Sequence, residues 1–141
     1  MVGLVVAAHG RLAEALLATA EQIVGRLAFV GTVSIEPGSA PVLIRQRIQT
    51  VVASVDQGLG VIVLVDLFGG TPCKESLMLC DSRDIEVVCG VNLPMLLKAE
   101  AIRQDAALTL AEKAQALARY GQKNITCASE LMRGTVATRG A

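Results

Sequence analysis

The chain has 141 residues, of which 52% are hydrophobic and 18% are charged. This length and composition fit one compact domain with a sizeable core, and they exclude extensive disorder. The 13 Lys and Arg residues balance 13 Asp and Glu residues, and aromatic residues make up only 2%. A nucleic-acid partner is therefore excluded, because the chain has neither a strong basic field nor aromatic side chains for stacking.

The apolar runs are too short to cross a membrane, which takes about 20 predominantly apolar residues. Polar residues or proline interrupt each of them, at His9, at Asp66 and at Asn92 and Pro94. The N-terminus also lacks the positive region and small-residue cleavage site of a signal peptide. We therefore expect a cytoplasmic protein.

Four cysteines are present, and no two of them form a C-x-x-C pair. With only one histidine in the chain, the usual zinc patterns cannot be completed, so no metal site is predicted. We expect reduced thiols packed as small hydrophobic residues. Cys73 differs slightly, because it follows a predicted helix start, where the helix dipole favours a thiolate.

Short β-branched runs alternate with helical segments, which predicts a parallel sheet with helices on both faces. The predicted strands are residues 2–8, 29–35, 60–67 and 85–91. The predicted helices are 11–24, 39–55, 71–80, 93–103 and 109–120. Ser39 and Thr71 are predicted helix caps, and Thr109 with Glu112 has the spacing of a capping box.

The fold class that follows is a three-layer, doubly wound α/β domain with a four-stranded, mainly parallel sheet in the order 2-1-3-4. Residues 124–128 are expected to add a short C-terminal edge strand. We place the domain at residues 1–130 and expect residues 131–141 to be a loose tail.

Two polar residues follow buried strands directly, His9 after the first and Asp66 near the end of the third. In the order 2-1-3-4 these strands are neighbours at the point where strand order reverses, so the two side chains should face each other. A carboxylate that accepts the proton of one imidazole nitrogen leaves the other nitrogen free to attack phosphorus.

Backbone groups near this pair suit an anion. Gly10 opens the first helix, and Gly69, Gly70 and Thr71 open the third, where unpaired N–H groups favour phosphate. The segment is not a P-loop, and no G-x-G-x-x-G follows the first strand. A lone histidine is more often structural than catalytic, and Asp66 could only cap a turn. The residues alone thus indicate an anion-handling site and no particular reaction.

Four segments in this order resemble the IIA component of the mannose-family sugar phosphotransferase system. They are Ala7-Ala8-His9-Gly10, Glu36-Pro37-Gly38, the run from Leu64 through Asp66-Leu67-Phe68-Gly69-Gly70-Thr71 to Pro72, and the run from Cys89 through Asn92 to Leu96. The likeness covers roughly residues 1–130. Phe68 stands where tryptophan is common, and Thr71 stands where serine is common.

The resemblance implies a phosphotransferase that uses no cofactor. His9 would accept a phosphoryl group from the carrier protein HPr and pass it to a IIB component, with membrane permease subunits involved only indirectly. Asp66 would orient His9, and the Gly-Gly-Thr-Pro segment would flank the phosphate. The family is typically a homodimer that exchanges its last strand, which would give residues 124–128 an edge to pair with.

Three alternatives remain open on the sequence alone. One is the phosphocarrier subunit of a dihydroxyacetone kinase system, in which serine usually follows the histidine in place of Gly10. A second is a regulatory phosphoprotein whose His9 phosphorylation state controls a partner without transport. The third is a nucleotide- or flavin-binding module of similar topology, which the missing phosphate-loop motifs disfavour. The sequence does not identify the sugar or the ring nitrogen that is phosphorylated.

Overall fold

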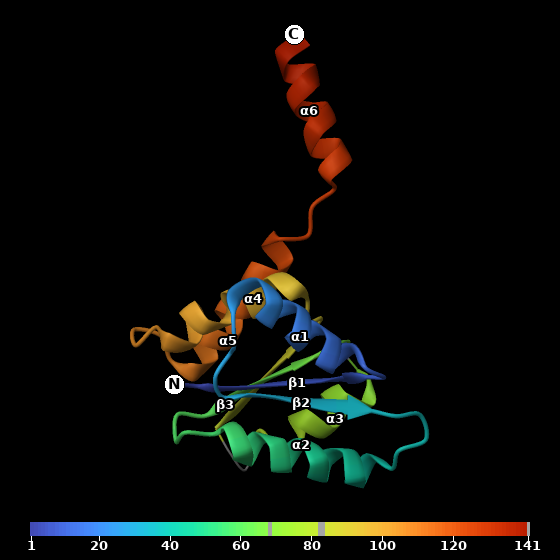
Figure 1. Cartoon of the computed structure of the whole chain (residues 1–141), viewed down its shortest axis with the longest axis vertical. Helices are drawn as coiled ribbons and strands as arrows, with labels where there is room; N and C mark the ends of the chain where they lie inside the picture. The colour runs from blue at the N-terminus through green and yellow to red at the C-terminus, as the bar shows by residue number, and fades with distance from the viewer. Residues whose placement is uncertain (68, 82–83, 141) are drawn as a thin grey trace.

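Four parallel strands form the centre of the molecule in the order β2-β1-β3-β4, as predicted (Figure 1). This computed structural model describes residues 1–67, 69–81 and 84–140. The strands are β1 (Gly3–His9), β2 (Val30–Ile35), β3 (Val61–Val65) and β4 (Ile85–Cys89). Each lies within two residues of its predicted bounds because the underlying runs are rich in buried β-branched side chains.

The strand register brings the carboxyl ends of the two central strands to the same edge. Ala7 pairs with Val33 of β2 and with Val65 of β3, and Val65 pairs in turn with Cys89 of β4. His9 ends β1, and Asp66 directly follows β3. The edge where ligands bind in such sheets therefore carries both predicted site residues.

Helices cover both faces of this sheet and complete the predicted three layers (Figure 1). On one face lie α1 (Leu12–Val24), α4 (Leu93–Gln104) and α5 (Leu110–Lys123). On the other face lie α2 (Pro41–Val55) and α3 (Thr71–Leu77). The strand that follows each crossover helix is parallel to the one before it, as a doubly wound fold requires.

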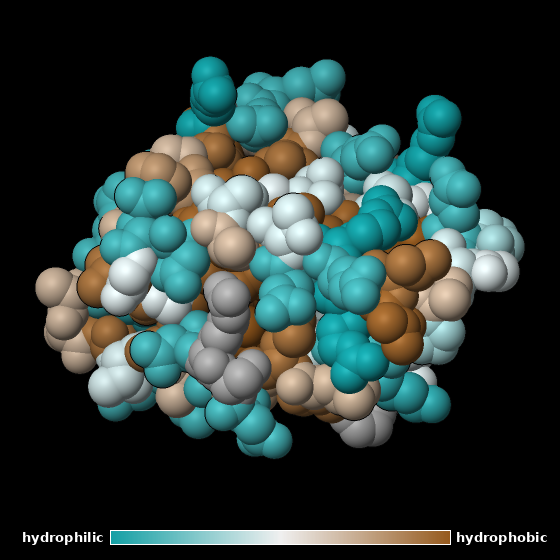
Figure 2. Space-filling view, turned by 90° about the horizontal axis from the view of Figure 1, so that it is seen from below, coloured by the Kyte–Doolittle hydropathy of each residue, from teal (hydrophilic) through white to brown (hydrophobic). Residues whose placement is uncertain are grey.

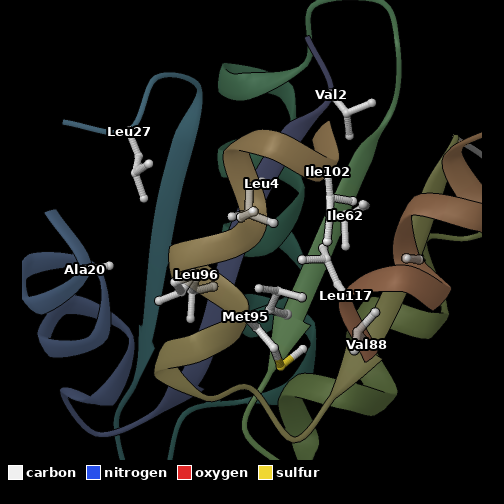
Figure 3. Packing of buried hydrophobic residues seen from close by; sticks show 14 of the residues in the cluster. Val2, Leu4, Ala20, Leu27, Ile62, Val88, Met95, Leu96, Ile102 and Leu117 are labelled. Atoms are coloured by element: carbon white, nitrogen blue, oxygen red, sulfur yellow. The ribbon is translucent and has the colours of Figure 1, made fainter. Parts of the chain in front are cut away.

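Alternating side chains of the strands fill two separate cores. Leu4 and Ile62 point toward α4 and α5, where they pack with Leu96 and Leu117 (Figure 3). Val5 and its neighbours on β3 point the other way and pack against the inner face of α2. The buried residues of that helix are Ile44, Ile48, Val52 and Val55, whereas Leu43 is exposed.

Helix starts agree only partly with prediction. The capping box of α5 is confirmed, because Glu112 N–H donates to the Thr109 hydroxyl and Thr109 N–H donates to the Glu112 carboxylate. The Ser39 hydroxyl instead donates to the carbonyl of Glu36 within the preceding turn, and Ala40 is the N-cap of α2. Thr71 is the first residue of α3, and Gly70 is the N-cap.

A buried arginine lies at the opposite end of the sheet from His9. Arg103 is only 1% exposed, and its Nη1 donates to the carbonyls of Val2 at 3.1 Å and Ala28 at 2.9 Å. Burial lowers the pKa of this guanidinium. Arg103 thereby links α4 to the start of β1 and to the segment that precedes β2.

The C-terminal segment differs from prediction. Residues 124–128 form no strand, and a helix, α6 (Ala128–Gly140), replaces the expected loose tail and extends away from the sheet (Figure 1). Ile125, Leu131 and Met132 expose 76%, 63% and 64% of their surface. The predicted edge strand has no pairing partner in this single chain, and residues 124–127 form a turn and an irregular connection between α5 and α6.

Polar and apolar side chains are interspersed on the face seen from the α2 side (Figure 2). The exposed apolar residues of α2 include Val42 and Leu43. Within the described ranges, no helix combines the length and the hydrophobicity needed to traverse a lipid bilayer.

Candidate active site

His9 and Asp66 meet at the carboxyl edge of the sheet, as strand order predicted. Asp66 Oδ2 lies 2.7 Å from His9 Nδ1 and also accepts a hydrogen bond from the His9 backbone N–H at 3.0 Å. Asp66 Oδ1 accepts a hydrogen bond from the Leu67 N–H at 3.0 Å. The carboxylate is thus held by the backbone N–H of His9, at the end of β1, and by that of Leu67, just after β3, in addition to its contact with the imidazole ring.

This geometry selects one tautomer of the ring. An ionised carboxylate only accepts hydrogen bonds, so the proton of a neutral imidazole lies on Nδ1, and the lone pair lies on Nε2. The His9 side chain is 48% exposed, whereas that of Asp66 is 10% exposed. The arrangement presents a nucleophilic nitrogen on an accessible ring and keeps its orienting carboxylate covered.

The pKa of Asp66 favours the ionised form. Partial burial by itself raises the pKa of this carboxyl, but the hydrogen bonds from His9 and Leu67 outweigh that effect and hold the pKa below its ordinary value of 3.8. Asp66 is therefore a carboxylate throughout the neutral range. It can stabilise a cationic ring without exchanging a proton itself.

The glycines predicted to bind phosphate lie in different positions relative to the ring. Gly70 lies beside it, since a Cβ added to this residue would be 3.2 Å from His9 Cε1. Gly69 has a φ of +81°, which only glycine adopts readily, and it turns the chain into α3. Gly10 has a φ of +59°, but its N–H donates to the carbonyl of Ile35 at 2.9 Å and is not free for an anion.

Thr71 opens α3 next to Gly70 and is half-buried. The first N–H groups of a helix have no acceptor within that helix. Gly70 and Thr71 are consequently better placed than Gly10 to contact an anion on the ring. Phe68, part of the same sequence segment, lies outside the described residues.

Three further residues lie near the site. The Asn92 side chain accepts a hydrogen bond from Met95 N–H and caps α4, and it also donates to the Gly121 carbonyl. Cys73 and Cys89 lie in contact, with 3.4 Å between their sulfur atoms. Sixteen residues separate the two cysteines, and only the packing of α3 against β4 brings them together.

In residues 1–67, 69–81 and 84–140, no three His, Cys, Asp or Glu side chains are grouped closely enough to hold a metal ion.

Comparison with known proteins points to one family. The family described as "PTS system fructose IIA component", of the mannose type, matches residues 3–118. The mannose-specific EIIAB component of Escherichia coli K12 is 35% identical over 105 residues, which cover 74% of this chain and 32% of that protein. The chain thus spans about a third of the length of this curated relative.

Solved structures show the same likeness. The mannose/sorbose-specific IIA subunit from Enterococcus faecalis is 30% identical with a TM-score of 0.78, over 89% of this chain and 92% of that one. The EIIA component from Streptococcus agalactiae is 26% identical with a TM-score of 0.82, over 92% and 99% of the two chains. The match over residues 3–118, on a fold whose sheet order was expected from sequence, shows that this chain belongs to the mannose-type IIA family of the sugar phosphotransferase system.

Proposed function

We propose that the protein is a phosphoryl carrier that takes up a phosphoryl group on Nε2 of His9. The observation that carries the proposal is the 2.7 Å contact between His9 Nδ1 and Asp66 Oδ2. It holds the Nδ1 proton and leaves the lone pair of Nε2 on a side chain that is 48% exposed. Family membership supports a phosphotransferase role in general.

The reaction we propose is a transfer between two nitrogen atoms. Nε2 of His9 attacks the phosphorus of a phosphohistidine on the donor, a new N–P bond forms, and the N–P bond of the donor breaks. The product ring carries a positive charge because Nδ1 keeps its proton. Asp66 stabilises that charge, and the N–H groups of Gly70 and Thr71 contact the phosphoryl oxygens. No metal or nucleotide is required, because the group is already activated on nitrogen.

We propose HPr as the donor and a IIB component as the acceptor. Both are proteins, and each must bring a bulky surface against the same ring. An exposed histidine at the edge of the sheet suits such an encounter better than a deep pocket would. The carrier would act in the cytoplasm and serve membrane permease subunits only through the IIB component.

The direct test is phosphoryl transfer in vitro. The purified protein is incubated with labelled phosphoenolpyruvate, enzyme I and HPr, and phosphate that is stable in alkali and labile in acid is measured on the chain. We expect close to one phosphate per chain, and none when HPr is omitted. Absence of label on folded protein, with donors from the same source organism that phosphorylate another IIA, would overturn the proposal.

We also propose that the protein is a homodimer in which the C-terminal segment contacts a second copy. Ile125, Leu131 and Met132 are large apolar residues that are exposed in the single chain, and burial of such residues favours association. Light scattering coupled to size-exclusion chromatography should give twice the mass of the chain. Truncation after residue 123 should return it to the monomer, and a monomeric full-length protein would contradict the proposal.

A further inference from the structure

Two thiols lie in contact directly behind the site. Cys73 is in the first turn of α3 and is 1% exposed, and Cys89 is the last residue of β4 and is partly exposed. Their sulfur atoms are 3.4 Å apart, and all four cysteines of the chain are free thiols. The other two are engaged elsewhere, Cys80 with the Ser76 carbonyl and Cys127 with the Ser129 hydroxyl.

In the single chain a groove opens beside this pair. Cys73 and Cys89 both line a groove of about 400 Å³ that runs beside β4, between α3 and α5. Its walls are mostly apolar and include Leu77, Val87 and Ala114, with Glu86 and Gln115 as the polar residues. A neutral oxidant as small as a peroxide fits such a groove.

We propose that Cys73 and Cys89 are a modification site, at which a peroxide converts the two thiols to a reversible disulfide. One thiol loses its proton, and its sulfur attacks a peroxide oxygen, which gives a sulfenic acid and releases the other oxygen as water. The second thiol attacks the sulfenic sulfur, forms the S–S bond and releases a second water. Two thiols and one hydrogen peroxide thus yield one disulfide and two waters.

The geometry requires only a small movement. An S–S bond is about 2.05 Å long, so the sulfur atoms must approach by less than the width of an atom from their present 3.4 Å. β4 is fixed by its ladder to β3, in which Cys89 pairs with Val65. The short helix α3 is held by fewer contacts and is expected to move toward β4.

Movement of α3 would reach the active site, and this consequence rests on the proposed function. Gly70, the N-cap of α3, lies beside the His9 ring, and Asp66 follows the residue that pairs with Cys89. A displacement of the first turn shifts the N–H groups of Gly70 and Thr71 away from a phosphoryl group on Nε2. We expect the disulfide to slow phosphorylation of His9 by about tenfold, since small misplacements of reacting groups have large effects on rate.

The pH dependence of oxidation should follow from the surroundings of Cys89. Burial, the contact with Cys73 and the charge of Asp66 raise the pKa of the Cys89 thiol to about 12. A raised pKa leaves Cys89 protonated at neutral pH, and the thiolate is the reactive form. Attack by Cys89 on the peroxide should therefore be slow at pH 7 and become faster as the pH rises.

Tryptic mapping tests the disulfide, because cleavage after lysine and arginine places each cysteine in a different peptide. Cys73 falls in 48–74, Cys80 in 75–83, Cys89 in 84–98 and Cys127 in 124–133. The protein is treated with hydrogen peroxide, alkylated, and digested without reduction. We expect a linked peptide made of 48–74 and 84–98 that dithiothreitol separates, that Cys73→Ser or Cys89→Ser abolishes, and that the matched control Cys80→Ser retains.

Separate readouts distinguish the two parts of the inference. Alkylated or over-oxidised peptides 48–74 and 84–98 without any link would overturn the disulfide. A link without a change in the rate of His9 labelling, compared with Cys89→Ser treated identically, would overturn its effect on the site. Failure of the reduced protein to accept phosphate would overturn the proposed function and leave the mapped disulfide standing.

Discussion

Replacement of His9 by glutamine should abolish acceptance of phosphate from HPr. His9 is the only histidine in the chain, so no second imidazole is available to carry the group. Glutamine keeps an amide that can donate to Asp66 but has no nucleophilic nitrogen. Labelling should fall by on the order of a thousandfold or more, to the background of the assay. The measurement is incorporation of acid-labile phosphate from phosphoenolpyruvate through enzyme I and HPr.

The variant should remain folded, because the His9 side chain is half exposed and its backbone N–H still donates to Asp66. Circular dichroism and thermal unfolding provide that control. Retention of label by a folded His9→Gln protein would place the phosphate on another residue. The chemical stability of the label would then show which class, since phosphate on a thiol or hydroxyl differs from phosphohistidine in its stability to acid.

Replacement of Asp66 by asparagine should slow the same transfer while leaving the histidine in place. The asparagine NH₂ group can donate to Nδ1, which moves the ring proton to Nε2 and occupies the nitrogen that must attack. The neutral amide also no longer stabilises the cationic phosphorylated ring. A loss of about 10²- to 10⁴-fold in rate is expected, by analogy with other carboxylates that orient a catalytic histidine. Rapid-quench labelling with saturating phospho-HPr measures it.

Asp56→Asn is a matched control for this variant. Asp56 follows α2 and accepts a hydrogen bond from Gly58 N–H, within a turn at the opposite end of the sheet. Its replacement should leave the labelling rate within about twofold, as expected for a surface position outside the site. Equal rates for wild type and Asp66→Asn would contradict the assigned role of Asp66.

The lowered pKa of Asp66 also gives the pH range of its effect on stability. Because the folded pKa lies below the ordinary value of 3.8, the carboxylate stabilises the folded state at pH values above about 4. That contribution is lost as the pH falls below 4 through the folded pKa. The difference in urea-unfolding free energy between wild type and Asp66→Asn should therefore be larger at pH 7 than at pH 3.

The strands and their order could be predicted from the sequence because a few strong physical signals agree. Buried β-branched runs such as Val61–Val65 have almost no alternative to a central parallel strand. Once that order is assumed, the meeting of His9 and Asp66 follows from topology alone. The turn into α3 could also be located from the sequence, because two consecutive glycines indicate a tight turn. Gly69 indeed has a φ of +81°, a conformation that favours glycine.

The details that depend on competing hydrogen bonds could not be predicted. The Ser39 hydroxyl could either cap the start of α2 or form a hydrogen bond within the preceding turn. It donates to the carbonyl of Glu36 in that turn and does not cap the helix. The N–H of Gly10 appears free in the sequence but pairs with Ile35 on the neighbouring strand. The C-terminal segment has weak periodicity, and its expected strand required an edge from outside the single chain.

The pairing of β1 with β3 is expected to precede the alignment of His9 and Asp66 during folding. His9 and Asp66 are 57 residues apart in the chain, and closing a loop of that length costs about 4 kcal/mol in chain entropy. The backbone hydrogen bonds between Gly3–Ala7 and Val61–Val65 offset this cost. The Asp66–His9 hydrogen bond is therefore not needed to close the loop. The two side chains therefore gain their alignment only after the non-local centre of the sheet has formed, which is the slow step in parallel folds. If the proposed function holds, a newly made chain would become competent to carry phosphate only at that moment, and its phosphorylation would report the completion of the central sheet.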